Sequence, residues 1–388
     1  MDIDEVLTRE VVNIIPDKEE LKKLLLSDKK LNVYLGIDPT ATKIHIGNAV
    51  PLRKLQKFVE MGHNVTFLIG DFTALIGDTS DKEGERPILT SEEITQNFQT
   101  YKKQAKKFLD FSKAKVRFNS EWLKKLDFTE IVKLCQQFTL GDFISRELIK
   151  KRLEAGKKVR FDETLYPVMQ GYDSYFMNTD LQIGSADQTF NMQAGRVLQK
   201  KLRHKETFVL VTGYIMGTDG KKMSKSMGNA IWLEDTPDDI YGKVMSLEDS
   251  LIPQYLELAT NLPIVAVQEK VKQLSGGGNP ITIKKELAFQ IVSELHGKPA
   301  AKEAQENFEK TFQERRPEYN LKIPLRETFA GTVSPFVSNP SVSAAKRLIK
   351  QGGVDVNDKS VTDVTYQPKI GDQLRIGSQT FGTVVEEK

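Results

Sequence analysis

An alternation of short apolar runs with an amphipathic helical segment, between residues 32 and 70, constrains the fold of this chain more than any other feature. Residues 32–38 and 64–70 are rich in β-branched and aromatic residues and end at turn-forming residues, so each run predicts a strand. Between them, apolar residues recur at helical spacing from Ile46 onward. Strand, loop, helix and strand in this order predict an α/β domain built on a doubly wound parallel sheet of the Rossmann type.

The rest of the N-terminal half continues this pattern. Residues 1–30 predict a helix, and residues 115–118 and 208–211 predict two further strands with helices between them. A chain of 388 residues is too long for one ordinary domain, so we expect the pattern to change further along.

The C-terminal part changes character twice. From Pro237 to about Arg316 the apolar spacing is helical and no strand is convincing, which predicts a separate α-helical domain. Residues 317–340 contain four prolines and predict a linker or a loosely ordered connection. The tail predicts a short helix from Ser343 to Gln351, followed by β-like runs at 354–356 and 373–376.

These changes predict three domains. The first is a Rossmann-like α/β domain over residues 1–232, with a connective insertion at about 118–165 and a loop at 217–229. The second is an α-helical domain over residues 233–320, and the third is a linker with a small α+β domain over residues 321–388.

Residue usage excludes several classes of protein. The single cysteine, Cys135, cannot form an internal disulfide, and four histidines leave almost no ligands for a structural zinc site. No run of about 18 apolar residues is present, which argues against a membrane-spanning helix, and the acidic N-terminus lacks the apolar segment of a secretion signal. We therefore expect a cytoplasmic protein without a metal site. The net charge of +3 is too small to indicate nucleic-acid binding by itself.

The first candidate site, residues 38–48, lies between the first predicted strand and its helix. Such a junction presents free backbone N–H groups and the positive end of the helix dipole, which together bind anions. Gly47 lets a ligand approach the backbone closely, and Thr40 and His45 add donors where charge gathers on a transferring phosphate. Taken alone, a junction with one histidine is more often structural.

The second candidate site is the loop at 217–229. Lys221, Lys222 and Lys225 lie within five residues and are flanked by glycines and serines. The ammonium groups repel one another, and a purely structural role does not explain why three of them lie so close together. The loop therefore predicts a flexible cationic segment that closes over a polyphosphate, and an exposed basic loop is the plainer alternative.

The third candidate site is a polar stripe on a predicted helix. Tyr166, Gln170 and Asp173 stand at positions i, i+4 and i+7, which places them on one helix face. The inner face of a packed helix is normally apolar, so this stripe predicts the wall of a pocket, with a wet surface as the alternative. Residues 180–188 (DLQIGSADQ) follow closely.

The first two patterns resemble those of the class I aminoacyl-tRNA synthetases. His45-Ile46-Gly47-Asn48 stands where that family has HIGH, and Lys222-Met223-Ser224-Lys225-Ser226 is the complete KMSKS motif. Together with residues 34–40 (YLGIDPT), the third pattern is similar to that of the tyrosyl-tRNA synthetases. This resemblance runs over nearly the whole chain and is closest to the bacterial subgroup, on the segments at 70–73 (GDFT) and 119–123 (NSEWL).

The resemblance implies a pocket for tyrosine. Tyr34 and Asp173 would hydrogen-bond the phenol hydroxyl of the substrate, a group that both gives and accepts. Phenylalanine would be rejected because it leaves these two groups unpaired. The remaining residues implied for tyrosine surround its α-ammonium and carboxylate: Asp78, Tyr166, Gln170 and Gln188.

The resemblance also implies that ATP binds as a substrate, with Mg²⁺ carried by ATP and no tightly bound cofactor. The residues implied for ATP binding are Asp38, Gly47, Gly184, Asp187, Ile215, Met216 and Lys225. Those implied to stabilise charge on the reacting phosphates are Thr40, His45, Asn48, Lys82, Arg86, Lys222 and Lys225. Asn48 replaces the second histidine of the family motif and its amide can still donate a hydrogen bond. Ser185 replaces a glycine, which a backbone contact to the ribose tolerates.

The tail resembles an S4 RNA-binding domain. Lys346, Arg347 and Lys350 cluster on its predicted helix, where they suit RNA phosphates. Because Asp355 and Asp358 lie nearby, we expect only weak RNA affinity from this module alone.

The activity implied by the resemblance is that of a tyrosine–tRNA ligase, which would activate L-tyrosine with ATP and transfer it to tRNA(Tyr). A homodimer is expected as well, through the helical region around residues 120–165. Three alternatives stay open on the sequence: a synthetase for another amino acid, tryptophan above all; a small-molecule nucleotidyltransferase; and an RNA-binding protein built on a decayed synthetase. The intact KMSKS motif, Asp78 and Gln170 speak against decay.

Overall fold

The structure is a computed structural model that describes residues 2–40, 42–78, 89–223, 227–313, 319, 321–337, 340–377 and 380–386. The chain divides into two compact units, Met1–Ile215 with Trp232–Glu234 and Gln254–Gln268, and Met216–Ile231 with Asp235–Pro253 and Glu269–Lys388. Among the described residues, no helix combines the length and the apolar character needed to cross a membrane.

The first unit is built on a twisted sheet. In the described residues its strands follow the order β1-β6-β5-β2-β3-β4, with the bounds β1 Val11–Ile15, β2 Asn32–Ile37, β3 Asn64–Ile69, β4 Lys115–Phe118, β5 Leu181–Ser185 and β6 Phe208–Thr212. The strands from β6 to β4 pair in parallel, and β1 joins the β6 edge in antiparallel orientation. The predicted Rossmann-type parallel sheet is therefore confirmed, with an antiparallel edge strand added.

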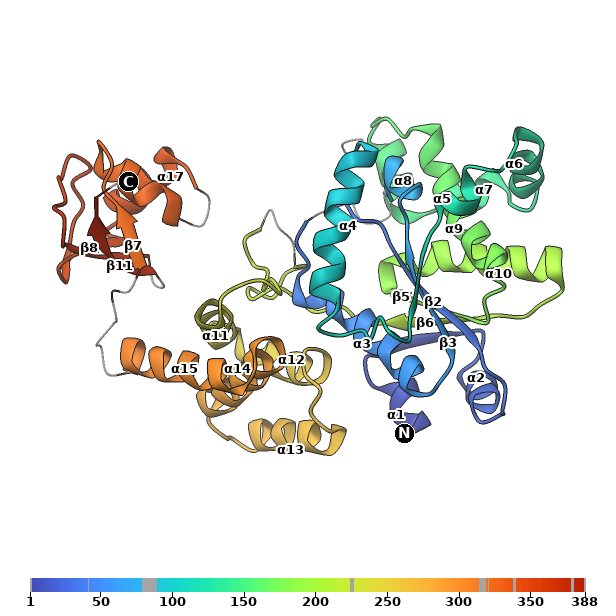
Figure 1. Cartoon of the computed structure of the whole chain (residues 1–388), viewed down its shortest axis with the longest axis horizontal. Helices are drawn as coiled ribbons and strands as arrows, with labels where there is room; N and C mark the ends of the chain where they lie inside the picture. Colours follow the sequence, from blue (N-terminus) through green and yellow to red (C-terminus); the bar gives the residue numbers. More distant parts are fainter. Residues whose placement is uncertain are drawn as a thin grey trace. The chain divides into compact units, whose positions relative to one another are not determined.

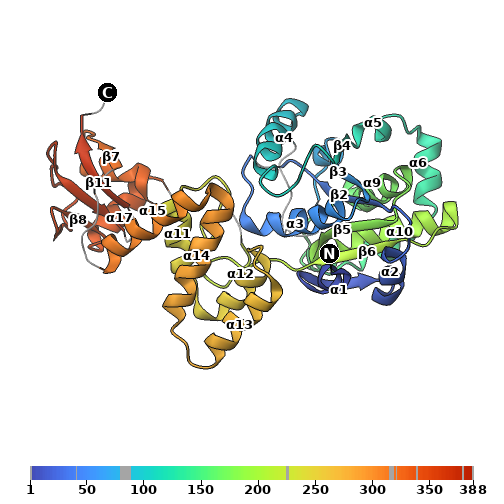
Figure 2. The ribbon, with the colours of Figure 1, turned by 60° about the horizontal axis from the view of Figure 1, so that its bottom comes forward.

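Helices cover both faces of this sheet (Figure 1). Their bounds are α1 Ile3–Thr8, α2 Lys18–Leu25, α3 Ile46–Glu60, α4 Ser91–Ala105, α5 Ser120–Leu123, α6 Phe128–Cys135, α7 Leu140–Ile144, α8 Glu147–Glu154, α9 Phe161–Phe176 and α10 Thr189–Arg203. The units β2-α3-β3 and β5-α10-β6 step along the sheet in opposite directions. Because such crossovers are right-handed, α3 and α10 lie on opposite faces, and the turned view in Figure 2 shows the same arrangement. Helix α9 packs along α10.

Two strands of the sheet were not predicted. Residues 11–15 lie inside the segment predicted as one helix, residues 1–30, and this prediction is wrong there: β1 separates α1 from α2. Its pairing with β6, Ile14 opposite Leu210, is a long-range contact that local spacing does not report. Strand β5 was quoted only as a motif, because Gln182 and Gly184 interrupt its apolar run, yet it is buried in the middle of the sheet.

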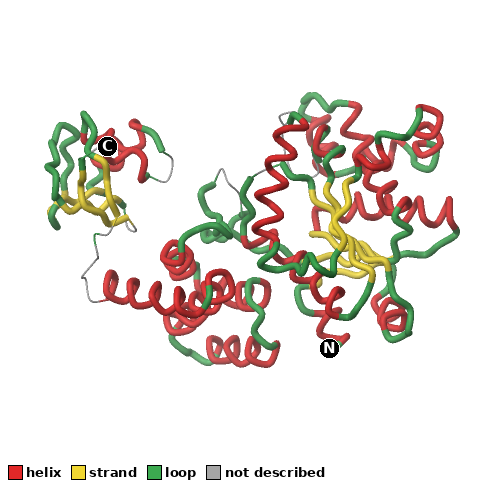
Figure 3. Tube along the Cα trace, viewed as in Figure 1, coloured by secondary structure: helices red, strands yellow, loops and turns green. Residues whose placement is uncertain are grey.

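Beyond the sheet, the chain is helical as predicted (Figure 3). These helices are α11 Pro237–Met245, α12 Ile252–Leu258, α13 Ile264–Ser275, α14 Pro280–His296 and α15 Lys298–Phe308. In the second unit α14 packs against α11 and α15. The start of α11 follows a local signal, since Thr236 caps it by accepting from the Asp239 N–H and Pro237 stands at its first position.

The C-terminal module is a small mixed sheet with two helices. The described strands follow the order β7-β11-β10-β8-β9, with the bounds β7 Leu321–Pro324, β8 Val354–Val356, β9 Lys359–Ser360, β10 Gln373–Ile376 and β11 Thr380–Val385. Helices α16 (Phe329–Val333) and α17 (Val342–Lys350) pack beside the sheet. The predicted loose connection at 317–340 is wrong for residues 321–337, because Ile323, Phe329 and Val333 belong to the core of this module.

Candidate active site

The candidate site lies between β2 and β5, where the order in which successive strands are added to the sheet reverses. Asp38 directly follows β2, and Asp187 and Gln188 follow the neighbouring strand β5. The helices after these strands lie on opposite faces, so the loops part and leave a crevice at the carboxyl ends of the strands. Residues from both sequence motifs, 38–48 and 180–188, meet at this place.

Tyr34 and Asp173 form the buried end of the site. Tyr34 lies on β2 and is 3% exposed, and Asp173 lies on α9 and is 2% exposed. Burial, followed by the charge of Asp173, raises the pKa of Tyr34 well above its usual value. Trp122 packs against Tyr34 and also donates to Asp173, so it connects the two groups. Leu68, Trp122 and Leu123 pack with Tyr34 and keep this end apolar.

Asp173 is held by donors that were not assigned a role from sequence. Trp122 Nε1 donates to its Oδ1 at 2.8 Å, and Asn119 Nδ2 donates to its Oδ2 at 3.2 Å. Burial raises the pKa of Asp173 to about 8, against the opposing effect of these two hydrogen bonds. Both donors lie in the segment 119–123, which was used above only as evidence for the bacterial subgroup.

Carboxylates gather next to this end. Tyr166 Oη donates to Asp38 Oδ2 at 2.9 Å. Burial raises the pKa of Tyr166 well above its usual value, and the charges of Asp38, Asp78 and Asp173 raise it further. A concentration of carboxylate and phenol oxygens suits an ammonium group. Gln170 lies one turn before Asp173 on α9 and is half-buried.

Asp78 and Gln188 are also brought together. Gln188 Nε2 donates to Asp78 Oδ2 at 2.6 Å, and Asn191 Nδ2 donates to the same oxygen at 3.1 Å. The sequence gave no role to Asn191, which is fully buried at the start of α10. These bonds fix the Asp78 carboxylate on the side of the site formed by the end of β5.

The start of α3 forms the second, more open end. The HIGH-like motif forms the start of α3. The His45 backbone N–H donates to Asn48 Oδ1 at 3.2 Å, so the Asn48 side chain helps to cap this helix. A Cβ at Gly47 would lie 3.0 Å from His45 Nδ1, which shows that the imidazole lies against the glycine. The ring also meets Trp232 edge-on, with centroids 5.9 Å apart. Thr40 is half-buried, and its N–H donates to the Asp38 carbonyl at 2.8 Å.

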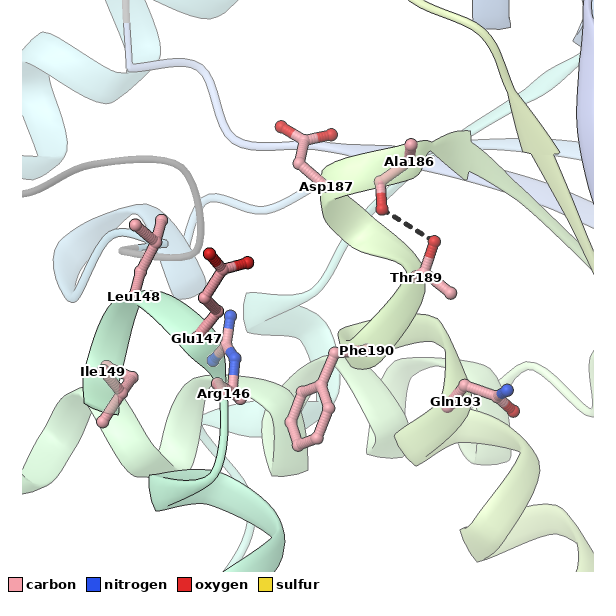
Figure 4. Close-up of a pocket in the computed structure, with 9 residues that line it drawn as sticks. All are labelled: Arg146, Glu147, Leu148, Ile149, Ala186, Asp187, Thr189, Phe190 and Gln193. Carbon is pink, nitrogen blue, oxygen red and sulfur yellow. Dashed lines mark hydrogen bonds between the residues drawn. The ribbon is translucent and has the colours of Figure 1, made fainter. Parts of the chain in front are cut away.

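Asp187 lies beside a pocket of about 530 Å³. The pocket also has Arg146, Phe190 and Gln193 in its lining (Figure 4). The Arg146 guanidinium lies 4.8 Å from the centre of the Phe190 ring. Ser185 Oγ donates to Asp187 Oδ1.

Packing accounts for Gly184 and Ile215. A Cβ at Gly184 would lie 2.9 Å from the Met192 sulfur, so a larger residue there would have to displace the Met192 side chain. Ile215 is buried at the end of the first unit. Both positions were predicted to bind ATP, and this role stays a prediction.

The basic loop is organised at its base by Asn229. Its Nδ2 donates to Asp219 Oδ1 at 2.7 Å and to the Lys222 carbonyl at 3.2 Å, and a Cβ at Gly217 would overlap its side chain. Lys222 is exposed, and its backbone pairs with that of Met216. The predicted residues Lys82, Arg86 and Lys225 lie outside the described residues.

The three basic residues predicted to contact RNA in the C-terminal module are exposed. Lys346, Arg347 and Lys350 lie on α17, whose opposite face carries the buried Ala345 and Ile349. Helical spacing therefore gathers the cations on the outer side of the module. Their role toward RNA stays a prediction.

Comparison with known proteins identifies the family. Residues 26–313 match the model of the tRNA synthetases of class I for tryptophan and tyrosine, and residues 338–374 match the S4 domain. The tyrosine–tRNA ligase of Carboxydothermus hydrogenoformans is 40% identical over 407 residues, covering 99% of this chain and 98% of that protein. The chain belongs to the tyrosyl-tRNA synthetases. The tyrosine–tRNA ligase of Thermotoga maritima is 38% identical, covering 97% of this chain and 95% of that protein.

The fold of this tyrosyl-tRNA synthetase is shared with solved structures. The tyrosyl-tRNA synthetase of Archaeoglobus fulgidus, determined in complex with L-tyrosine, aligns with a TM-score of 0.62. It covers 78% of this chain and is itself covered completely, at 23% identity. A likeness at this identity concerns the fold. The family is ATP-dependent, in agreement with the expected substrate.

Proposed function

We propose that this chain is a tyrosine–tRNA ligase that joins L-tyrosine to tRNA(Tyr) in two steps, through a tyrosyl-adenylate. The observation that supports this most is the buried pair of Tyr34 and Asp173 beside a group of carboxylates. A phenol fits the first feature and an α-ammonium fits the second. A tryptophan side chain would need no such pair for a hydroxyl, so this observation favours tyrosine over the other amino acid of the family.

For tyrosine binding, we assign the phenol hydroxyl to Tyr34 and Asp173. The α-ammonium is assigned to Asp78, Tyr166 and Gln170, because their oxygens accept hydrogen bonds from a cation. Gln188, which is bonded to Asp78, would lie near the substrate carboxylate and orient it toward ATP.

In the first step, a carboxylate oxygen of tyrosine attacks the α-phosphorus of ATP. A new O–P bond forms, the bond from the α-phosphorus to its bridging oxygen breaks, and pyrophosphate leaves with the electron pair. The reaction needs no nucleophile from the protein, so catalysis comes from positioning and from charge stabilisation. We assign the latter to Thr40 and His45, with ATP held by Asp38, Gly47 and Asp187.

Further positive charge for the leaving pyrophosphate is assigned by motif. Lys222 and Lys225 belong to KMSKS, and Lys82 and Arg86 to the polar loop after Asp78. Mg²⁺ would arrive with ATP and neutralise part of the charge of its phosphates.

In the second step, a hydroxyl of the terminal ribose of tRNA attacks the tyrosyl carbonyl, and AMP leaves. We assign the ribose of ATP to Asp187, and the pocket beside this residue offers space next to it, which supports entry of the tRNA 3′ end from this side. The exposed Lys346, Arg347 and Lys350 on α17 support a second contact, to RNA phosphates. We place this reaction in the cytoplasm, where the tRNA substrate is found.

A homodimer is proposed from exposed apolar side chains in the first unit. They lie on α6, α7 and α9, at Phe128, Val132, Leu140, Ile144 and Phe161. Exposed apolar side chains favour association when they are covered by a partner, and these five lie in the region expected from the sequence. Analytical ultracentrifugation tests the dimer.

Tyrosine-dependent exchange of labelled pyrophosphate into ATP tests the proposed activity. We expect exchange with tyrosine and none above background with tryptophan or phenylalanine. Exchange that depends on tryptophan would favour the other branch of the family. No exchange with any amino acid, together with tRNA binding, would favour a decayed synthetase.

A further inference from the structure

Gln182 is a polar side chain in the middle of the sheet. It lies on β5 between β2 and β6, and it is 1% exposed. A buried amide without hydrogen-bond partners destabilises a fold, so its partners have to be part of the structure. These partners connect it to the site.

The orientation of the Gln182 amide is fixed by its surroundings. Its Nε2 donates to the Met192 carbonyl at 2.9 Å, and its Oε1 accepts from Tyr34 Oη at 3.0 Å. The Met192 carbonyl can only accept, so the amide nitrogen has to lie there and the amide oxygen has to face Tyr34. Helix α10 leaves room for this group, since a Cβ at Gly195 would lie 2.8 Å from both amide atoms.

This arrangement determines what Tyr34 offers to a ligand. A phenol carries one hydrogen, and that of Tyr34 is directed to Gln182. Toward the pocket, Tyr34 therefore presents lone pairs. Asp173 accepts from Trp122 and Asn119, and burial raises its pKa to about 8, so it carries a proton at neutral pH. It can therefore donate to a phenol oxygen while Tyr34 accepts the phenol hydrogen.

We propose that Gln182 is a specificity-determining positioning residue, which holds the Tyr34 proton so that Tyr34 accepts a hydrogen bond from the phenol of bound tyrosine. The inference rests on the proposed function. A ligand with a donor at the para position is then required. Phenylalanine has no donor and leaves the Tyr34 lone pairs unpaired. Without Gln182, the Tyr34 hydroxyl turns to Asp173, where it competes with tyrosine and reduces the penalty for phenylalanine.

The test is Gln182→Met, which keeps the volume of the side chain and removes both polar atoms. In pyrophosphate exchange we expect KM for tyrosine to rise about tenfold and kcat to stay within about twofold. The ratio of kcat/KM for tyrosine over phenylalanine should fall about tenfold. In a Tyr34→Phe background the same substitution should not change this ratio further, because Gln182 acts through the hydroxyl that is missing there.

The matched control is Gln199→Met. Gln199 is another fully buried glutamine, on α10, and its Nε2 donates to the Ser174 carbonyl at 2.7 Å. The same change there should lower the melting temperature without changing the tyrosine over phenylalanine ratio. An equal loss of this ratio in Gln199→Met would assign the effect to general loosening of the core and overturn the proposal.

Gln182→Glu provides a second variant if the methionine variant does not fold. Burial raises the pKa of a carboxyl group, and a neutral carboxyl still accepts from Tyr34 and donates to Met192. This variant should therefore keep the tyrosine over phenylalanine ratio within about threefold of the wild type. A tenfold loss in Gln182→Glu would overturn the proposal.

A ligand series on the wild-type protein needs no variant. With Tyr34 as an acceptor, 4-aminophenylalanine, a donor, should be activated better than phenylalanine, and 4-fluorophenylalanine should not. The reverse order would show that Tyr34 donates to the ligand and would overturn the proposal. If the wild-type protein shows no tyrosine-dependent exchange, both the proposed function and the role of Gln182 fail. Normal exchange with an unchanged ratio in Gln182→Met refutes the role of Gln182 alone.

Discussion

The two ends of the active site are built differently. At the phenol end, Tyr34, Asp173 and Gln182 are almost completely buried, and their polar atoms are bonded to other buried groups. At the nucleotide end, His45 is half-buried at the start of a helix and Asp187 is exposed beside an open pocket. One end is formed by tertiary packing, and the other by a local turn and helix start.

This difference matches the tasks proposed for the two ends. Telling tyrosine from phenylalanine depends on one hydroxyl, and a buried site makes an unpaired hydroxyl costly because water cannot replace the lost bond. Phosphates carry their own charge and bind to backbone N–H groups and exposed cations without being fully buried. The comparison therefore predicts separable effects on amino-acid selectivity and on phosphate chemistry.

The largest effect is expected from Asp173→Ala. Trp122 and Asn119 would lose a buried acceptor, and the phenol of tyrosine would lose a partner, so kcat/KM for tyrosine should fall about 10²–10³-fold in pyrophosphate exchange. Asp162→Ala is the control, because Asp162 lies on the same helix but its side chain is 40% exposed and pairs with Arg160. An unchanged preference for tyrosine over phenylalanine in Asp173→Ala would refute the pocket assignment.

His45→Ala should affect the other end. Loss of one group that stabilises charge on the leaving phosphate lowers kcat by about 10²-fold, while KM for tyrosine should stay within about twofold because His45 is at the start of α3. The control is His63→Ala, a histidine beyond the opposite end of the same helix. A large rise in KM for tyrosine with normal kcat would contradict the separation of the two ends.

The pH dependence of stability should report the buried end. The pKa of Asp173 is raised from 3.8 to about 8 in the folded protein. Between these values the folded state holds a proton that the unfolded state releases, so this group makes stability fall as pH rises from about 4 to 8. Without ligand, the melting temperature of Asp173→Asn should therefore decline less over this range than that of the wild type. If the melting temperatures of the variant and the wild type instead fall in parallel as pH rises, Asp173 is ionised in the folded protein.

The smallest effect is expected from Asn48→Ala. It removes the acceptor for the His45 backbone N–H and should lower the free energy of unfolding by about 1 kcal/mol. KM for ATP should rise only a few-fold, as measured by exchange at varied ATP, since the His45 side chain remains. Asn48→His, which restores the family motif, is the comparison variant. A loss of kcat in Asn48→Ala as large as that of His45→Ala would instead indicate direct contact of the Asn48 amide with the phosphates.

The sequence predicted the elements that carry local signals. β2, α3 and β3 have the predicted spacing, and α9 places Tyr166, Gln170 and Asp173 as expected from their positions in the chain. The sequence did not predict β1 or β5 as strands, because one is defined by pairing with β6 and the other carries a glutamine and a glycine within its apolar run. Nor did it show residues 321–337 as part of a core.

By itself, the sequence determined the family, the two nucleotide motifs and the residue types available for tyrosine, because these are recorded in short runs of neighbouring residues. Only the tertiary structure decided the partners of those residues. The bonds of Gln182 to Tyr34 and of Trp122 to Asp173 join residues 148 and 51 positions apart. Hydrogen-bond direction in a buried pocket depends on which donors and acceptors meet across such distances, and spacing along the chain does not report it.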